Sequence, residues 1–281
     1  MNEYIELGVI NTLQINRVSE PGIYLICEDG EEVLLPNAYI TNEMNVGDTL
    51  DVFVYTDSED RLVSTTLKPY LYKNEFAALE VVDTAMFGAF VDIGLPKDLL
   101  VPKNKQKSSF EEGDTKVIQM VEDEKTDRLM GTEKFTLQTV SSKSDEYRRN
   151  DEVEVLVYMK SPLGFKVIVD NTYDGLMYHN EIFSEVHVGD YKRAYIRQIR
   201  EDGKLDISLQ RIGAKGSDAN SQIVLDVLNT HNNEISFTYK SDAEDIRNVF
   251  GLSKKAYKAS LTKLIDEKKI ILTESSIKLN V

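Results

Sequence analysis

Three groups of residues recur in the same order along the chain, and this repetition limits the available folds more than any other feature. Two groups, a glycine that opens an alternating strand and a Gly-Asp pair, begin at Gly22, Gly88 and Gly164 and at Gly47, Gly113 and Gly189. Both are separated by 66 and then 76 residues. A basic residue followed by leucine, at Arg61, Arg128 and Lys204, keeps nearly the same spacing. Unrelated segments rarely do this, so the sequence predicts three tandem repeats.

Each repeat is predicted to be a small all-β barrel. It is longer than a solenoid unit, and its period-two strands are separated by Gly, Asp and Asn turns. In the strand after the repeated glycine, one phase is apolar, as at Ile23 and Leu25, and is expected to face the core. The other phase begins with Tyr24, Phe90 or Lys166 and leads to a carboxylate. An aromatic or cationic side chain should therefore project from the solvent face of each barrel.

After residue 212 the strand pattern gives way to helical spacing. The small and polar residues 211–220 predict a linker, followed by a helix near 221–230. A capping-box pattern predicts a second helix from Ser241 to Gly251, and Ser253 should cap a third. Residues 270–281 then resemble two short strands around a polar turn. Three helices and a hairpin are typical of a winged-helix domain.

Two segments carry a family resemblance. Phe87-Gly-Ala-Phe-Val-Asp-Ile-Gly94, followed by 98–102, resembles the RNA-binding repeat first named for ribosomal protein S-one, and 174–182 with 203–209 resembles it again. Three such repeats before a winged helix are similar to the conserved virulence factor B family of bacterial RNA-binding regulators. The resemblance covers nearly all of residues 3–212 and implies a five-stranded OB barrel for each repeat.

The expected fold is therefore mainly β, with three tandem five-stranded OB-type barrels and a small α+β domain at the C-terminal end. The expected boundaries are 1–67, 68–140, 141–212 and 213–281. The resemblance implies a single-stranded RNA-binding protein that regulates gene expression after transcription, including expression of virulence factors.

The resemblance also implies where RNA binds. In the S-one family, bases stack on aromatic side chains of the second and third strands, beside a basic residue of the last strand. Only the second repeat keeps both aromatic residues, Phe87 and Phe90, and its basic residue is Arg128. The third repeat keeps a ring at Tyr178 and a cation at Lys204. Further cations of the third repeat and of the third C-terminal helix complete the predicted set: Lys166, Arg193, Lys254, Lys255 and Lys258.

Charge is distributed unevenly. The net charge of −15 argues against a protein that coats duplex DNA, because phosphate neutralisation supplies most of that affinity. The four segments carry −11, −3, −2 and +1 in chain order, so a polyanion should prefer the C-terminal half. The acidic first repeat suits a protein partner better than RNA. Two alternatives to RNA regulation thus remain: a DNA-binding transcription regulator that uses the winged helix, and an acidic protein-binding adaptor.

Catalytic and metal chemistry find little support in the sequence. The three histidines, His179, His187 and His231, are scattered, and the single Cys27 allows neither a disulfide framework nor a thiolate zinc cluster. Acidic clusters at 57–60 and 122–124 fall on expected hairpin turns. We expect no enzymatic activity, metal or cofactor. The sequence also lacks a membrane span and a secretion signal, so we expect a cytoplasmic protein, active as a monomer.

Overall fold

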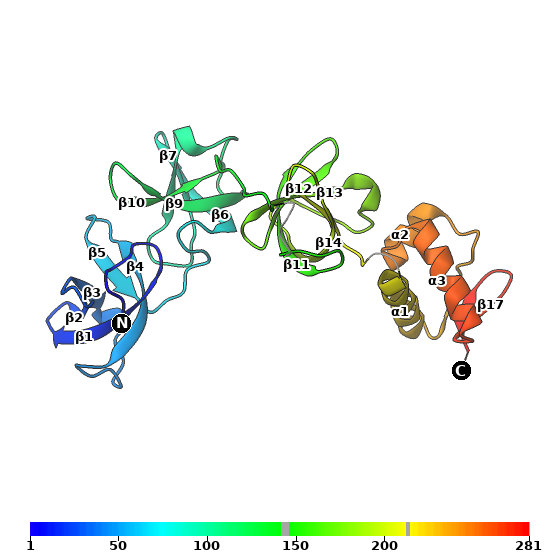
Figure 1. Cartoon of the computed structure of the whole chain (residues 1–281), viewed down its shortest axis with the longest axis horizontal. Coiled ribbons are helices and arrows are strands. Elements are labelled where there is room, and N and C mark those ends of the chain that lie inside the picture. The colour runs from blue at the N-terminus through cyan, green and yellow to red at the C-terminus, as the bar shows by residue number, and fades with distance from the viewer. Residues whose placement is uncertain (142–145, 212–213, 281) are drawn as a thin grey trace. The chain divides into compact units, whose positions relative to one another are not determined.

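The computed structural model describes residues 1–141, 146–211 and 214–280. The chain divides into two compact units, Met1–Thr136 and Leu137–Val281. The first unit contains two five-stranded sheets, and the second contains a third sheet followed by the helices (Figure 1). The prediction of a mainly β chain with a small helical domain at its C-terminal end is confirmed. Among the described helices, none combines the length and the apolar character needed to cross a membrane.

Barrel 1 is closed, with strand order β1-β2-β3-β5-β4. Its strands are β1 (Ile10–Val18), β2 (Gly22–Ile26), β3 (Glu32–Pro36), β4 (Thr49–Thr56) and β5 (Leu62–Thr65). The parallel pair Leu34 and Val63 closes it. Leu13, Leu25 and Leu35 are fully buried in its core, as the strand alternation predicts.

Barrel 2 also has five strands, but its sheet is open, with order β10-β9-β6-β7-β8. The strands are β6 (Phe76–Ala85), β7 (Gly88–Val91), β8 (Leu99–Pro102), β9 (Thr115–Asp123) and β10 (Arg128–Thr132). The predicted five-stranded barrel is only partly closed here, because β8 and β10 meet through side chains. A Cβ on Gly131 would lie 2.7 Å from Val101 Cγ2. At the end of β10, the hydroxyl of Thr132 and the amide of Glu133 both donate to the carbonyl of Lys105, which follows β8.

Barrel 3 is closed in the same order as barrel 1, β11-β12-β13-β15-β14. Its strands are β11 (Glu152–Lys160), β12 (Gly164–Val169), β13 (Tyr173–Tyr178), β14 (Tyr191–Ile199) and β15 (Leu205–Ser208). In each barrel a short 3-10 turn follows the third strand: Asn37–Tyr39, Lys103–Lys105 and His179–Glu181. This shared detail supports the internal repeat.

The repeated glycine has the same physical cause in all three barrels. A Cβ would lie 2.1 Å from the carbonyl oxygen of Leu35 at Gly22, and 2.6 Å from that of Val101 at Gly88. At Gly164 it would lie only 1.8 Å from the carbonyl oxygen of Met177. The second strand thus approaches the third too closely for any side chain at this position.

Barrels 1 and 2 share an apolar contact inside the first unit. Strand β4 is buried on both faces: Val52 and Val54 point into barrel 1, whereas Phe53 belongs to the core cluster of barrel 2. The ring of Phe53 lies 6.1 Å from the rings of Tyr55 and Tyr72. Barrel 1 therefore contributes a strand to the packing of barrel 2.

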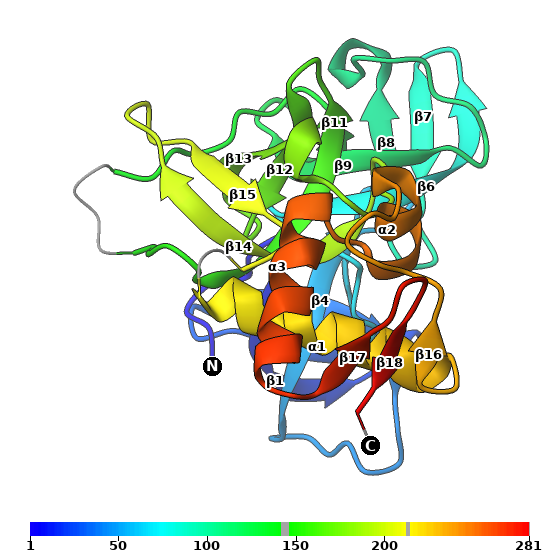
Figure 2. The ribbon, with the colours of Figure 1, turned by 90° about the vertical axis from the view of Figure 1, so that its right-hand side faces the viewer.

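The C-terminal domain has the predicted winged-helix elements (Figure 2). They are α1 (Ala214–Thr230), β16 (Glu234–Ile235), α2 (Ala243–Phe250), α3 (Lys254–Asp266), β17 (Ile270–Leu272) and β18 (Ile277–Leu279). Strand β16, which the sequence did not predict, pairs with β18. Leu228, Phe250, Tyr257 and Leu261 are buried among these elements.

Two local predictions in this domain are wrong. Helix α1 begins at Ala214, inside the expected linker, because tertiary contacts extend it: Asp218 forms an ion pair with Lys263 of α3, and Ser221 is buried. The cap of α2 is Asp242, whose carboxylate accepts from the amide of Glu244 at 2.7 Å. The hydroxyl of Ser241 instead accepts from the amide of Thr238. Ser253 caps α3 as predicted, and Gly251 ends α2 with a φ of 62°.

Candidate nucleic-acid interface

A groove of about 610 Å³ lies in the first unit, between the solvent face of barrel 2 and the β4–β5 hairpin of barrel 1. Barrel 2 supplies most of its lining, including Phe87, Phe90, Asp98, Leu100, Pro102, Arg128 and Met130. The hairpin supplies Tyr55, Thr56, Ser58 and Asp60. This groove brings together the three residues predicted to bind RNA in the second repeat.

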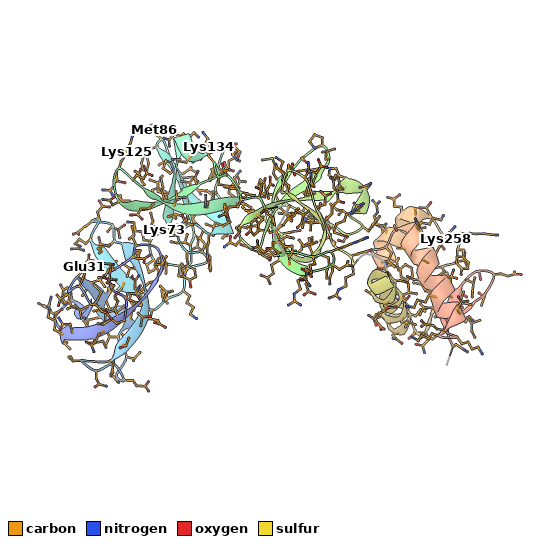
Figure 3. All side chains as sticks on the ribbon, in the orientation of Figure 1. Glu31, Lys73, Met86, Lys125, Lys134 and Lys258 are labelled. Carbon is orange, nitrogen blue, oxygen red and sulfur yellow. The ribbon has the colours of Figure 1, made fainter. Side chains whose placement is uncertain are left out.

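Two phenylalanine rings, Phe87 and Phe90, line the groove. Phe87 lies in the β6–β7 turn and is 62% exposed, next to Met86, which projects fully into solvent (Figure 3). Phe90 lies on the solvent phase of β7, while its neighbours Ala89 and Val91 are buried. The ring centroids of Phe87 and Phe90 are 6.1 Å apart and the rings are nearly perpendicular. The exposed ring of Phe87 and the partly exposed ring of Phe90 offer faces on which bases can stack.

Arg128 begins β10 at the edge of the groove and forms an ion pair with Asp60 of barrel 1. Both side chains are about half exposed. Asp98, which also lines the groove, has a raised pKa, first because burial disfavours its charge and then because of the nearby Asp92 and Asp83. Of the two cations that line the groove, Lys97 and Arg128, Arg128 is therefore already paired with a hairpin carboxylate.

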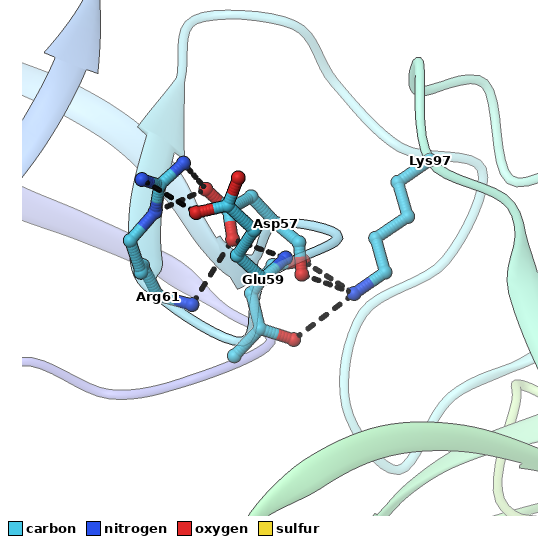
Figure 4. Close-up of polar contacts among 5 residues, drawn as sticks. Asp57, Glu59, Arg61 and Lys97 are labelled. Carbon is cyan, nitrogen blue, oxygen red and sulfur yellow. Dashed lines mark hydrogen bonds and ion pairs between the residues drawn. The ribbon is translucent and has the colours of Figure 1, made fainter.

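Lys97 fastens the hairpin to barrel 2 (Figure 4). Its Nζ donates to the backbone carbonyl of Thr56 at 2.8 Å and to that of Asp57 at 2.7 Å. Burial lowers the pKa of Lys97, and the carboxylates of Asp60 and Asp57 oppose that shift. The ammonium group therefore fixes the position of the hairpin and is not free to meet a phosphate.

Sequence reasoning missed Tyr55 and Lys97. Burial raises the pKa of Tyr55 to about 12, so its phenol stays neutral and adds a third ring to the groove lining. One signal was available: β4 reads Val52-Phe-Val-Tyr55, an unbroken apolar run that indicates a strand buried on both faces.

In barrel 1 the corresponding surface is already occupied. The guanidinium of Arg17 lies 3.7 Å from the ring centroid of Tyr24 and pairs with Glu32 at 2.7 Å. Arg61, at the position of Arg128, pairs with Asp57 and Glu59 of its own hairpin. The ring and the cation of this repeat therefore contact protein groups, in keeping with its acidic character.

In barrel 3 the solvent face is polar and internally paired. Strand register places Lys166 beside Leu176, and Leu176 beside Asp206. Asp206 is 2% exposed, and its carboxylate accepts from the hydroxyl of Tyr178 at 3.2 Å and from Gln198 at 2.7 Å. Burial is the main cause of the raised pKa of Tyr178. This face offers hydrogen-bonding groups, and its described residues include no counterpart of the Phe87–Phe90 pair.

The other predicted cations of barrel 3 differ in their surroundings. Lys204 pairs with Asp174 on the same face, at 2.8 Å. Arg193 is 79% exposed, but it lies opposite Glu154 of β11 and within 3.8 Å of Glu152. It therefore occupies an acidic depression and not the face of Tyr178.

The three predicted lysines of the winged helix lie at the start of α3. Lys255 and Lys258 are exposed, and Lys258 projects from the helix (Figure 3). Neither has an ion-pair partner among the described residues. Lys254 is partly exposed and lies near Asp242, whose pKa is lowered mainly by the amide of Glu244 and to a smaller extent by this lysine. This helix therefore carries two exposed cations of the predicted set that are not paired with a described carboxylate.

Comparison with known proteins agrees with this architecture. Residues 7–67 match the S1 domain, and residues 222–279 match the CvfB-like winged helix domain. YitL of Bacillus subtilis is 27% identical over 266 residues, which cover 92% of this chain and 89% of YitL. Conserved virulence factor B of Staphylococcus saprophyticus is 25% identical over 281 residues, or 97% of this chain and 94% of the relative. These matches confirm the resemblance to the conserved virulence factor B family.

A solved structure aligns with the chain over a similar range. It is the crystal structure of a multidomain protein with nucleic acid binding domains from Streptococcus pneumoniae, 24% identical, with a TM-score of 0.46. The alignment covers 97% of this chain and 98% of that protein. The matched S1 and winged-helix domains are themselves of types that bind nucleic acid, so nucleic-acid binding is the function that the domain content supports.

Proposed function

We propose that this chain binds single-stranded RNA, with bases stacked on Phe87 and Phe90 in the groove of barrel 2. The observation that carries the proposal is this pair of nearly perpendicular rings lining one groove, with Phe87 exposed and Phe90 partly exposed. Stacking accepts any base, and of the two cations that line the groove Lys97 is already held by hairpin carbonyls, so the binding has little sequence preference and moderate affinity. Arg128 meets the phosphate backbone.

The proposed role in the cell is post-transcriptional regulation, without catalysis. The name Conserved virulence factor B belongs to the relatives, and we extend virulence-related regulation to this chain on the strength of similarity along almost its whole length. The protein acts in the cytoplasm as a monomer.

The test is to replace both rings, Phe87→Ala with Phe90→Ala, in the full-length protein. Loss of a stacking ring costs about 1–3 kcal/mol per base, so the dissociation constant for a labelled single-stranded RNA should rise at least several-fold. Fluorescence anisotropy at several salt concentrations measures this, and circular dichroism checks the fold. Tyr4→Ala is the matched control, because it removes a 57% exposed ring that does not line the groove.

Duplex DNA of the same length is titrated in parallel. The exposed Lys255 and Lys258 of α3 support duplex binding by the winged helix as the second candidate function. Unchanged RNA affinity in a folded double variant would contradict the stacking proposal. Tight duplex binding that RNA cannot displace would favour the winged helix.

A further inference from the structure

The three barrels carry a basic residue at equivalent positions, but it is partnered differently in each. In barrel 3, Lys204 pairs with Asp174 of its own barrel. The matching residues of barrel 2 are Arg128 and Asp98, because Asp98 precedes Leu100 by two residues as Asp174 precedes Leu176. Arg128 nevertheless pairs with Asp60, 68 residues earlier in the chain and on barrel 1.

The hairpin that presents Asp60 is held rigidly. The carboxylate of Asp57 accepts from the amides of Glu59 and Arg61, at 2.9 and 3.0 Å, and from the side chain of Arg61. Lys97 ties the backbone carbonyls of Thr56 and Asp57 to barrel 2 (Figure 4). Asp60 itself has a φ of 61°, a turn conformation that aspartate and asparagine tolerate.

Besides Asp57, the same hairpin carries two carboxylates, Glu59 and Asp60, that point in different directions. Glu59 pairs with Arg61 of the hairpin and does not line the groove. Asp60 lines the groove and reaches across to Arg128. Because only one of the two contacts barrel 2, the effect of the ion pair can be separated from that of the overall negative charge.

We propose that Asp60 regulates the barrel 2 groove by competing with RNA phosphate for Arg128. A strand that stacks on Phe87 and Phe90 gains the phosphate contact only when it displaces this carboxylate. The acidic first repeat thereby lowers the electrostatic contribution to the free energy of RNA binding in this groove. Stacking on the rings is then the main source of affinity. This inference rests on the function proposed above.

The competition predicts a specific salt signature. In Asp60→Asn the guanidinium of Arg128 is released for one more phosphate contact. The slope of log K against log salt for single-stranded RNA should steepen by about 0.7, the value for one phosphate on a single strand. At low salt the affinity should rise roughly two- to five-fold, which is the range for an exposed ion pair.

The experiment uses the full-length protein and a labelled single-stranded RNA, with anisotropy titrations at several salt concentrations. Glu59→Gln is the matched control, because it removes the same charge from the same hairpin and should leave the slope unchanged. Asp60→Gly also accepts the positive φ and should reproduce the steeper slope. In an Arg128→Gln background, Asp60→Asn should have no effect.

The outcomes separate the two proposals. If the ring variant loses RNA affinity while Asp60→Asn behaves like Glu59→Gln, the competition is wrong and the stacking proposal stands. If Asp60→Asn steepens the slope while the ring variant binds normally, the competition stands and stacking is wrong. An effect of Asp60→Asn that persists in the Arg128→Gln background would overturn the inference.

Discussion

Truncation of Phe53 should loosen the contact between barrels 1 and 2. Phe53 belongs to a strand of barrel 1, yet its fully buried ring packs in the core cluster of barrel 2, beside Tyr55 and Tyr72. Replacing a buried phenylalanine by alanine costs about 3–5 kcal/mol, because the transfer free energy is lost and a cavity remains. A domain is stable by only about 5–15 kcal/mol, so this is a large fraction.

Urea unfolding of the full-length Phe53→Ala variant measures the loss. Tyrosine fluorescence is the probe, since the chain has 14 tyrosines and no tryptophan. Native-state hydrogen exchange then locates the loss: amides should exchange faster in both barrels of the first unit.

Leu13→Ala is the matched control. Leu13 is also fully buried, but it lies in the core of barrel 1 alone, so faster exchange should be confined to that barrel. The packing argument is refuted if Phe53→Ala lowers the free energy of unfolding by less than about 1 kcal/mol. It is also refuted if this variant exchanges amide hydrogens faster only in barrel 1.

Two further predictions concern pH and charge. Burial raises the pKa of Asp98 in the folded protein. The free energy of folding that this carboxyl contributes is therefore fully present below its pKa in the unfolded chain, and it is lost as the pH rises through its pKa in the folded protein. Asp98→Asn should therefore unfold at a higher temperature than the wild type near neutral pH and lose that advantage in acid; equal melting temperatures at neutral pH would contradict this. Residues 141–281, with a net charge of −1, should bind RNA better than residues 1–140, with −14. Titration of both halves with one RNA checks this, and an N-terminal half that binds as well as the whole chain would disprove it.

Much of the fold could be predicted because it depends on local and periodic features. The glycines at Gly22, Gly88 and Gly164 are required by the close approach of two neighbouring strands, so the repeat was visible in the sequence. Alternation alone placed Phe90 on the solvent face of β7, where the structure has it. The cap at Ser253 follows from a hydroxyl that accepts from a nearby amide.

The features that sequence reasoning missed depend on contacts between distant segments. Helix α1 starts at Ala214 because Asp218 pairs with Lys263, 45 residues away. Local helix propensity cannot predict such a contact. The same holds for the groove. Arg128 meets Asp60 because barrel 1 packs against barrel 2 through Phe53, and a repeat pattern says nothing about how neighbouring repeats dock.

The negative charge of the N-terminal half affects an approaching RNA phosphate mainly through these short-range contacts, and less through the long-range electrostatic field. Screening limits a field to roughly 8 Å at physiological salt, so the placement of single carboxylates decides what a phosphate meets. In barrel 2, hairpin oxygens of barrel 1 hold both Lys97 and Arg128. The rings of Phe87 and Phe90 remain the accessible feature there. Lys255 and Lys258, exposed and not paired with a described carboxylate, lie instead on α3, so stacking and electrostatic contact with RNA should fall on different domains of one chain.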